Sequence, residues 1–286
     1  MLQNCATLKQ IRFYLLKELR QIYTENESDS IARLILEHVG YSLSVTLREP
    51  DLVPAPLITS KINTFAAEIR SGIPVQYILG LTEFCNLPLR VDPNVLIPRP
   101  ETEEMVEHIK TSSPSSVQRI IDLGTGSGCI ALALKQHFSK AEVWGVDNSR
   151  QALQVAGENG RKNKLHVNWG YMDLLNIHPL DQWEAFELVV SNPPYVRNSE
   201  REKMTAQVLD FEPESALFVP DTDPLVFYRA IVSFCKLHLA GRGEIWVEIN
   251  EQLGQETARL FIQEGFGKVR ILKDIHEKHR FIHARK

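Results

Sequence analysis

The sequence predicts an α/β protein in which a small bundle of α-helices precedes a mostly parallel sheet with helices on both faces. Three observations predict this fold class: helical spacing of apolar residues up to about residue 80, strand and helix patterns that alternate after residue 98, and a glycine-rich turn after the first of these strands. The chain has 286 residues, more than a typical single domain. We therefore expect a helical domain over residues 1–76, a hairpin-like linker over 77–97 and an α/β domain over 98–286.

The expected helical domain shows the spacing of amphipathic helices. A first helix brings apolar residues to one face at steps of three and four, namely Leu8, Ile11, Leu15, Leu19 and Ile22. A second helix is expected from about Ser28 to just before Gly40, and a third from about Thr59 to Arg70. Such a bundle either stabilises the chain or recognises a partner, and we assign it to substrate recognition.

The linker has short apolar runs interrupted by Gly80, Pro88 and Pro93, which is typical of a hairpin. Beyond it the two patterns alternate. Expected strands cover residues 119–123, 141–146, 166–169, 187–191 and 243–249, and expected helices cover residues 129–138, 149–162 and 225–238. This alternation specifies a mostly parallel sheet, whose ligands bind at the carboxyl ends of the strands.

Composition argues against several classes of function. Lys and Arg number 32 against 36 Asp and Glu, a net charge of −4, so the basic excess of many nucleic-acid-binding proteins is missing and no stable nucleic-acid partner is expected. The four cysteines form no CxxC pair, so we expect neither a metal site nor a disulfide scaffold. No apolar run reaches the roughly 18 residues of a membrane span. We expect a monomeric, cytoplasmic protein.

The segment "RIIDLGTGSGCIALAL" places a glycine turn between a strand and a helix. Glycine permits positive φ and close approach of a ligand to the backbone, so a nucleotide-like ligand is expected against Gly124, Thr125, Gly126, Ser127 and Gly128. A dinucleotide fingerprint would require glycine where Cys129 stands. The spacing is therefore GxGxG, which weakens an NAD interpretation.

Carboxylates stand at the ends of three expected strands. Asp147 ends the strand after the glycine turn, where it either accepts hydrogen bonds from two ribose hydroxyls or caps the helix near Ser149. Asp122 lies within an apolar strand and needs a partner, for which a cationic methionine amino group is suitable. Asp173 and Leu174 follow the next strand, where an adenine would find a hydrogen-bond acceptor and an apolar edge.

The segment "FELVVSNPPYV" ends a buried strand in a rigid corner made of Asn192, Pro193, Pro194 and Tyr195. The two prolines fix φ and remove backbone donors, so the corner is stiff and rich in acceptors. Asn and Pro are also ordinary turn formers, so a simple strand end remains the alternative.

Together, the glycine turn, the acid at the next strand tip and NPPY resemble the Rossmann-like, seven-stranded class I methyltransferases, which use S-adenosyl-L-methionine (SAM) to methylate planar nitrogens. Four further segments are similar to the protein-(glutamine-N5) methyltransferases of the PrmC/HemK type: "GIPVQYILGLTEF" at 72–84, "NVLIPRPETEEMV" at 94–106, "EPESAL" at 212–217 and "KDIHEKHR" at 273–280. These enzymes modify the glutamine of the GGQ motif in class 1 peptide-chain release factors. The resemblance implies SAM as cofactor and release factors as partners.

Carried over motif by motif, the resemblance assigns roles to the positions named above. It places catalysis at Asn192, Pro193 and Tyr195, and substrate binding at these three residues and Pro194. Cofactor binding falls to Gly124, Thr125, Gly126, Ser127, Gly128, Asp147, Asp173, Leu174 and Asn192. The segment 94–106 is implied to cover the cofactor and shape the glutamine pocket, with Arg99 holding nearby carboxylates.

Two segments depart from the family pattern. In "FVPDTDPL", Val219-Pro220 and Asp223-Pro224 stand where a glycine pair and Asp-Gly are usual, so we expect the loop 218–224 to follow a different path. Glu277 replaces a usual glycine in the last motif.

The corner suggests a mechanism. The Asn192 side-chain oxygen and the Pro193 carbonyl each accept one N–H of the substrate amide, while Tyr195 forms an aromatic wall. Three alternatives remain: an adenine-N6 methyltransferase of DNA or RNA, whose substrate presents the same two N–H groups; a non-catalytic adaptor with a vestigial site; and an NAD-dependent oxidoreductase.

Overall fold

The structure is a computed structural model that describes residues 2–3, 5–176 and 183–286. Contacts between residues divide the chain into two compact units. The helical unit comprises Met1–Gly80 and Ala206–Phe211, and the catalytic unit, so called from here on for its cavity, comprises Leu81–Thr205 and Glu212–Lys286. Among the described residues no helix is both long and apolar enough to span a membrane.

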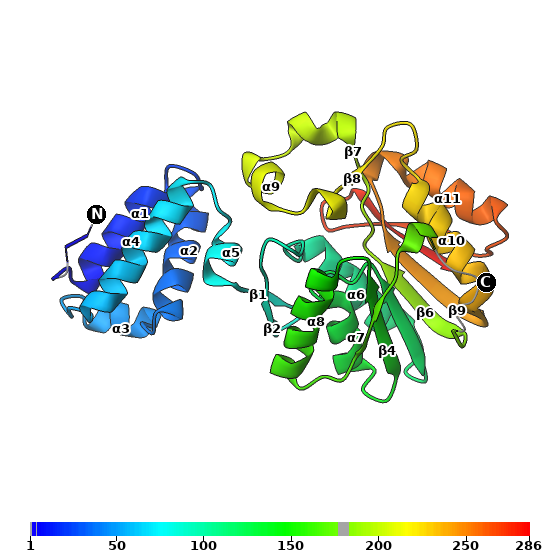
Figure 1. Cartoon of the computed structure of the whole chain (residues 1–286), viewed down its shortest axis with the longest axis horizontal. Coiled ribbons are helices and arrows are strands. Elements are labelled where there is room, and N and C mark those ends of the chain that lie inside the picture. Colours follow the sequence, from blue (N-terminus) through cyan, green and yellow to red (C-terminus); the bar gives the residue numbers. More distant parts are fainter. Residues whose placement is uncertain (1, 4, 177–182) are drawn as a thin grey trace. The chain divides into compact units, whose positions relative to one another are not determined.

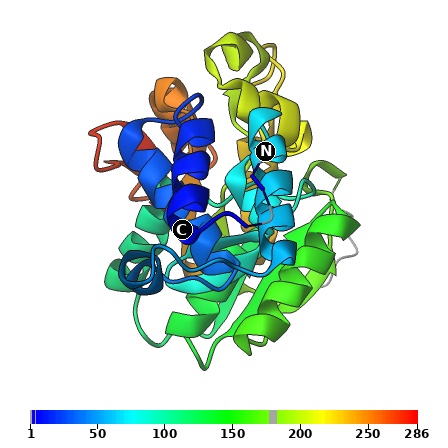
Figure 2. The same cartoon turned by 90° about the vertical axis from the view of Figure 1, so that its left-hand side faces the viewer.

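The helical unit confirms the expected N-terminal helices. Its helices are α1 (Leu8–Leu19), α2 (Glu25–His38), α3 (Leu43–Arg48), α4 (Pro56–Arg70), α5 (Val75–Leu79) and α9 (Ala206–Phe211). Helix α1 packs against α2 and α4, as Figures 1 and 2 show from two sides. The apolar face expected for α1 is buried, except that Ile22 lies beyond the helix and is 40% exposed.

Local signals explain where these helices begin. Helix α2 starts earlier than Ser28 because the Thr24 hydroxyl accepts the Glu27 N–H while the Glu27 carboxylate accepts the Thr24 N–H, a capping box. Helix α4 starts at Pro56, a residue suited to a first helical turn. Helix α9 joins this unit from far along the chain, and Gln207 Nε2 donates to the Tyr23 hydroxyl oxygen at 2.7 Å.

The catalytic unit contains the expected seven-stranded, mostly parallel sheet. Its strands are β3 (Arg119–Leu123), β4 (Glu142–Asp147), β5 (Asn168–Tyr171), β6 (Phe186–Ser191), β9 (Leu239–Glu248), β10 (Arg270–Lys273) and β11 (His279–Arg285), in the spatial order β10-β11-β9-β6-β3-β4-β5. Strand β11 is antiparallel to both neighbours. Strand β9 begins earlier than expected because Leu239 pairs with Phe186, ahead of an irregularity at which β9 has extra residues between Leu239 and Glu244.

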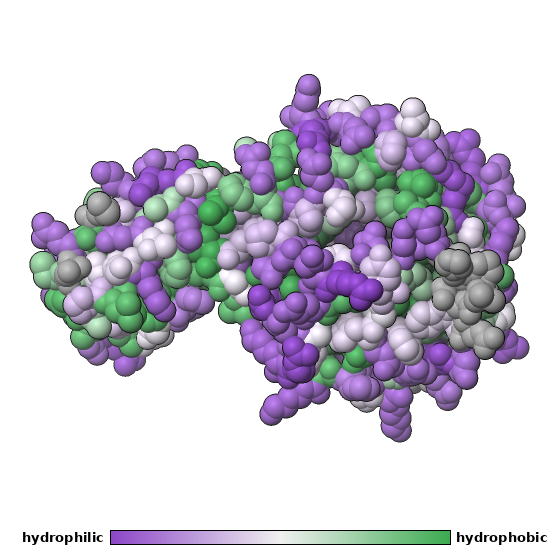
Figure 3. Space-filling view, in the orientation of Figure 1, coloured by the Kyte–Doolittle hydropathy of each residue, from purple (hydrophilic) through white to green (hydrophobic). Residues whose placement is uncertain are grey.

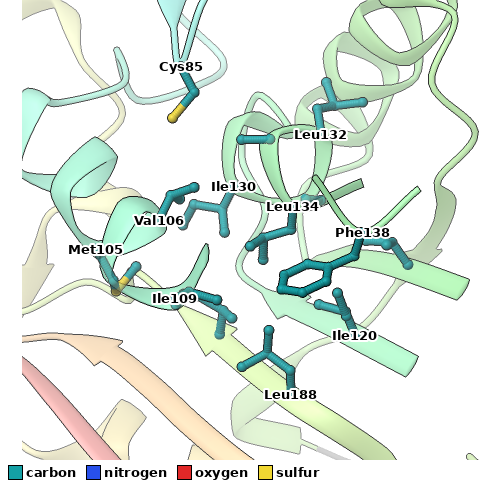
Figure 4. Packing of buried hydrophobic residues seen from close by; sticks show 14 of the residues in the cluster. Cys85, Met105, Val106, Ile109, Ile120, Ile130, Leu132, Leu134, Phe138 and Leu188 are labelled. Atoms are coloured by element: carbon teal, nitrogen blue, oxygen red, sulfur yellow. The ribbon is translucent and has the colours of Figure 1, made fainter. Parts of the chain in front are cut away.

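Two apolar cores cover the two faces of this sheet. Ile120 packs on one face and Ile121 on the other, as the alternation of a strand requires. The first core holds α6 (Pro100–Ser112) and α7 (Cys129–His137), and Figure 4 shows side chains of both helices meeting Leu188 of β6. The second core holds α10 (Val226–His238) and α11 (Gly254–Gln263). Hydrophilic residues cover much of the visible face outside these cores (Figure 3).

The hairpin expected near residues 77–97 consists of β1 (Leu81–Phe84) and β2 (Leu87–Arg90), joined by Cys85 and Asn86 at positive φ. It is held to α8 (Arg150–Asn163) by Asn159, which is fully buried. Asn159 Oδ1 accepts the Arg90 N–H at 2.6 Å, and Nδ2 donates to the Arg90 and Ser127 carbonyls, both at 2.9 Å. One side chain therefore ties the hairpin to the glycine turn.

Candidate active site

A cavity of about 350 Å³ opens at the carboxyl ends of β3, β4 and β6. The last residues of these strands, Leu123, Asp147 and Ser191, all line it. Parallel sheets bind ligands at this edge because successive strand ends and the loops after them converge there. Other parts of the wall come from Pro93 to Leu96 with Pro98 and Arg99, from Thr102 of α6, from Pro213, Ser215 and Ala216, and from Phe227 of α10.

The cavity brings together most of the predicted site residues. Those that line it are Gly124, Thr125, Gly126, Ser127, Asp147, Leu174, Asn192, Pro193 and Pro194. Gly128, Asp173 and Tyr195 do not line it. Gly128 lies behind the turn, where an added Cβ would meet the Trp169 ring at 2.8 Å. Asp173 is used locally, because its carboxylate accepts the Leu175 N–H at 3.0 Å and Asn176 Nδ2 at 2.6 Å.

The glycine turn and Asp147 are joined by a hydrogen bond. Gly124 and Gly126 have φ of +75° and +54°, and a Cβ added at either would enter open space, so the backbone is accessible from the cavity. The Gly126 N–H donates to Asp147 Oδ2 at 2.9 Å, and the Ser149 N–H donates to Oδ1 at 2.8 Å. Burial raises the pKa of Asp147, and these N–H groups partly offset the effect. The N-cap of α8 is Ser149, so the capping role considered for Asp147 is wrong.

Asp122 lies behind the turn and is fully buried. Its Oδ2 accepts a hydrogen bond from the Thr125 hydroxyl at 2.6 Å, while Oδ1 has no partner within the described part of the chain. Burial raises the pKa of Asp122 to about 7, against the lowering effect of Thr125. Asp122 does not line the cavity, whereas Thr125 does, so direct contact with a bound ligand is not supported.

The NPPY corner is braced by two residues that the sequence had not singled out, Thr102 of α6 and Glu248 of β9. Asn192 Nδ2 donates to Thr102 Oγ1 at 3.1 Å, and Thr102 Oγ1 donates to Glu248 Oε2 at 2.8 Å. The Tyr195 hydroxyl donates to Glu248 Oε1 at 2.8 Å, and its ring packs against the second core. Tyr195 therefore braces the corner from behind.

Glu248 is a nearly inaccessible carboxyl, 1% exposed. Burial raises its pKa, while the hydrogen bonds from Thr102 and Tyr195 and the charge of Arg280 act in the opposite direction. A charged residue at the end of the apolar strand "EIWVE" is the same signal that drew attention to Asp122. It was the one sequence signal for Glu248.

Arg99 holds a carboxylate, as expected for this segment. Its Nη2 lies 2.6 Å from Glu212 Oε1, and Glu212 Oε2 accepts the Ile97 N–H at 3.2 Å. The pair joins Arg99, which lines the cavity, to the residue just before Pro213, which lines another wall of it. Helix α6 begins directly afterwards at Pro100, a residue suited to a first helical turn.

The structure describes both segments that depart from the family pattern, and the different path expected for the loop 218–224 stays a prediction. The loop that starts at residue 218 begins with β8 (Phe218–Val219), which pairs in parallel with β7 (Val196–Arg197) just after the NPPY corner. Glu277 has φ of +62°, a left-handed conformation that favours glycine. Among the described residues, no three His, Cys, Asp or Glu side chains cluster as a metal site would require.

Comparisons with known proteins agree with this geometry. The methyltransferase small domain model matches residues 100–217. A release factor glutamine methyltransferase of Flavobacterium psychrophilum is 38% identical over 96% of this chain and 98% of its own length. A protein of the same description from Bacteroides thetaiotaomicron is 36% identical over 97% of this chain and 99% of its own length.

Solved structures show the same fold at low identity. A Thermus thermophilus 16S rRNA N2 G1207 methyltransferase in complex with AdoMet and guanosine superposes with a TM-score of 0.52 at 19% identity, covering 72% of this chain and 49% of that one. A Pyrococcus furiosus methyltransferase gives 0.51 at 16% identity, covering 80% and 97%. The sheet and its helices are therefore those of the class I methyltransferases.

Proposed function

The chain belongs to the family of release factor glutamine methyltransferases, and from this premise we propose that it methylates the side-chain amide nitrogen of a glutamine in peptide-chain release factors. SAM is the methyl donor. The substrate glutamine is that of the GGQ motif. The observation that carries the proposal is that Asn192 and Pro193 line one cavity with the glycine turn and Asp147.

The glycine turn and Asp147 suit the nucleoside end of SAM. The Asp147 carboxylate is held at the strand tip by the Gly126 and Ser149 N–H groups, in a position to accept ribose hydroxyls. Leu174 supplies an apolar edge for the adenine. When bound, SAM supplies a methyl group already activated on a sulfonium. The adenine contact predicted for Asp173 stays a prediction, because Asp173 does not line the cavity.

The NPPY corner suits a planar NH2 group. A carboxamide nitrogen is a poor nucleophile because its lone pair is delocalised into the carbonyl. The Asn192 Oδ1 and the Pro193 carbonyl each accept one substrate N–H, which orients the nitrogen and favours positive charge on it as the methyl arrives. Pro193 and Pro194 keep these acceptors preorganised. The extra proton leaves after transfer, so no strong base is needed beforehand.

An adenine-N6 amine would present the same two N–H groups, but the family membership and the net charge of −4 both favour a protein substrate. We infer that the helical unit recognises the release factor and that the protein acts as a cytoplasmic monomer without a stable nucleic-acid partner.

Replacing Asn192 tests this proposal. Asn192→Ala removes an acceptor for the substrate but not the residues assigned to the nucleoside, so we expect turnover to fall about 100-fold while SAM affinity changes little. Asp147→Ala is the matched control and should weaken SAM binding first. Release-factor methylation and calorimetric SAM titration measure the two effects. Wild-type turnover in Asn192→Ala would refute the proposed role of the corner.

A further inference from the structure

We propose that Thr102 is a positioning residue that sets which way the Asn192 amide faces, and that Glu248 dictates the direction of the hydrogen bonds behind it. The inference rests on the proposed function, in which Asn192 must offer its oxygen to the substrate. The hydrogen bond in question is the one that Asn192 makes to Thr102, on the side away from the substrate.

The three residues come from three separate elements. Asn192 and Thr102 line the cavity, and Glu248 lies behind Thr102. Thr102 lies in the first turn of α6, Glu248 ends β9, and Asn192 follows β6. Asn192 Nδ2 to Thr102 Oγ1 measures 3.1 Å, and Thr102 Oγ1 to Glu248 Oε2 measures 2.8 Å. Thr102 and Glu248 are 2% and 1% exposed, so water does not compete for these bonds.

Counting protons gives this row of bonds one direction. Thr102 and Tyr195 each donate to one oxygen of Glu248, and these bonds together with the charge of Arg280 favour the ionised carboxylate, which has no proton and only accepts. The Thr102 hydroxyl has a single proton and gives it to Glu248. Only its lone pairs remain for Asn192, so Asn192 must turn its NH2 group toward Thr102. Within the described residues, no hydrogen bond is donated to Asn192 Oδ1.

The orientation matters because the opposite one would oppose binding. If the amide were flipped, Asn192 Nδ2 would point its N–H groups at the N–H groups of a substrate carboxamide. Two donors cannot pair, and the substrate would keep only the Pro193 carbonyl as acceptor. The Glu248 charge thus selects an acceptor at the cavity through the Thr102 hydroxyl, without contact with substrate.

Thr102→Val tests this inference, since valine has nearly the shape of threonine but no hydroxyl. We expect kcat to fall about tenfold, the value of one hydrogen bond of about 1.4 kcal/mol. The SAM dissociation constant should stay within twofold. Thr102→Ser restores the hydroxyl and should recover most of the lost kcat. Thr111→Val is the matched control on the same helix, because the Thr111 hydroxyl donates only to the backbone carbonyls of Glu107 and His108.

Several outcomes would overturn the inference: wild-type kcat in Thr102→Val, a serine variant as slow as the valine variant, or a valine variant whose main loss is in SAM affinity. Should Thr102→Val fail to fold, Glu248→Gln serves instead. The glutamine amide brings an N–H donor to a place where the Thr102 and Tyr195 hydroxyls both donate, so one of them must turn around. This variant should lower kcat with SAM binding kept, and unchanged kcat would contradict us. If Asn192→Ala is inactive while Thr102→Val is not impaired, only this inference fails. If Asn192→Ala stays active, the proposed function of the corner fails.

Discussion

The ion pair of Arg99 and Glu212 is predicted to hold the cavity wall together. Replacing Arg99 by Met keeps much of the side-chain volume. It leaves the Glu212 carboxylate, whose side chain is 2% exposed, with the Ile97 N–H as its one remaining donor among the described residues. Removing one partner of a fully buried pair costs roughly 3–5 kcal/mol. The Arg99 side chain is 31% exposed, so water partly replaces it, and we expect about 2 kcal/mol.

For a unit of this size, about 2 kcal/mol lowers the melting temperature by roughly 4–8 °C. Calorimetry with and without SAM measures the shift, and the transition that SAM raises identifies the catalytic unit. Arg259→Met is the control, because Arg259 pairs with Glu256 on the surface and the loss should stay below about 1 kcal/mol.

A double variant separates the ion pair from general packing. Glu212→Gln removes the buried charge but keeps an acceptor for the Ile97 N–H, so it should partly rescue Arg99→Met. The double variant is expected to melt above Arg99→Met alone. A melting temperature of Arg99→Met equal to that of the wild type would refute this role of the ion pair. So would a double variant whose loss of melting temperature equals the sum of the losses of the two single variants.

Two further predictions concern the glycine turn. Burial raises the pKa of Asp122 from its ordinary value of 3.8 to about 7, so the Asp122 contribution to the stability of the fold is greatest below pH 3.8, falls as the pH rises, and is lost once the pH passes 7. Asp122→Asn should reduce this loss. The measurement is the change in the urea midpoint between pH 5 and pH 8, and the same change in the variant and the wild type would contradict the prediction. Gly145→Ala adds a Cβ 2.4 Å from the Trp169 ring and 2.8 Å from Thr125 Oγ1, so we expect a loss of roughly 1–3 kcal/mol by denaturant titration and weaker SAM binding. An unchanged denaturation midpoint would contradict this, because it would mean that the Trp169 ring moves aside with no loss of stability.

Local patterns were sufficient to predict the centre of the sheet. Strand β3 matches its predicted bounds, and β4 and β6 lie within one residue of theirs, because apolar runs bounded by Gly, Asp or Pro define them. The helices α3, α5 and α11 and the strands β10 and β11 were not predicted. Some of these elements are short. The others mix polar and apolar residues without a clear period, so only their packing in the fold shows which side is buried.

The residues that line the cavity could be predicted from the sequence, whereas the residues that brace them from behind could not. Gly124 and Asn192 stand in compact motifs that can be read within a few residues. Thr102 and Glu248 are 146 residues apart and meet only when α6 and β9 are folded together. The same limit applies to α9, whose six residues pack into the helical unit from position 206 onward. Tyr195 was assigned to the cavity wall, but its place behind the corner follows from Glu248.

The central claim is that the NPPY corner presents a planar carboxamide nitrogen to the methyl group of SAM. The most direct measurement incubates the purified protein with isotope-labelled SAM, a class 1 release factor and, in parallel, adenine-containing DNA and RNA, and then locates the label by mass spectrometry. The account predicts one labelled methyl on the amide nitrogen of the GGQ glutamine and none on nucleic acid. Label on adenine, or on a release-factor residue other than that glutamine, would contradict it.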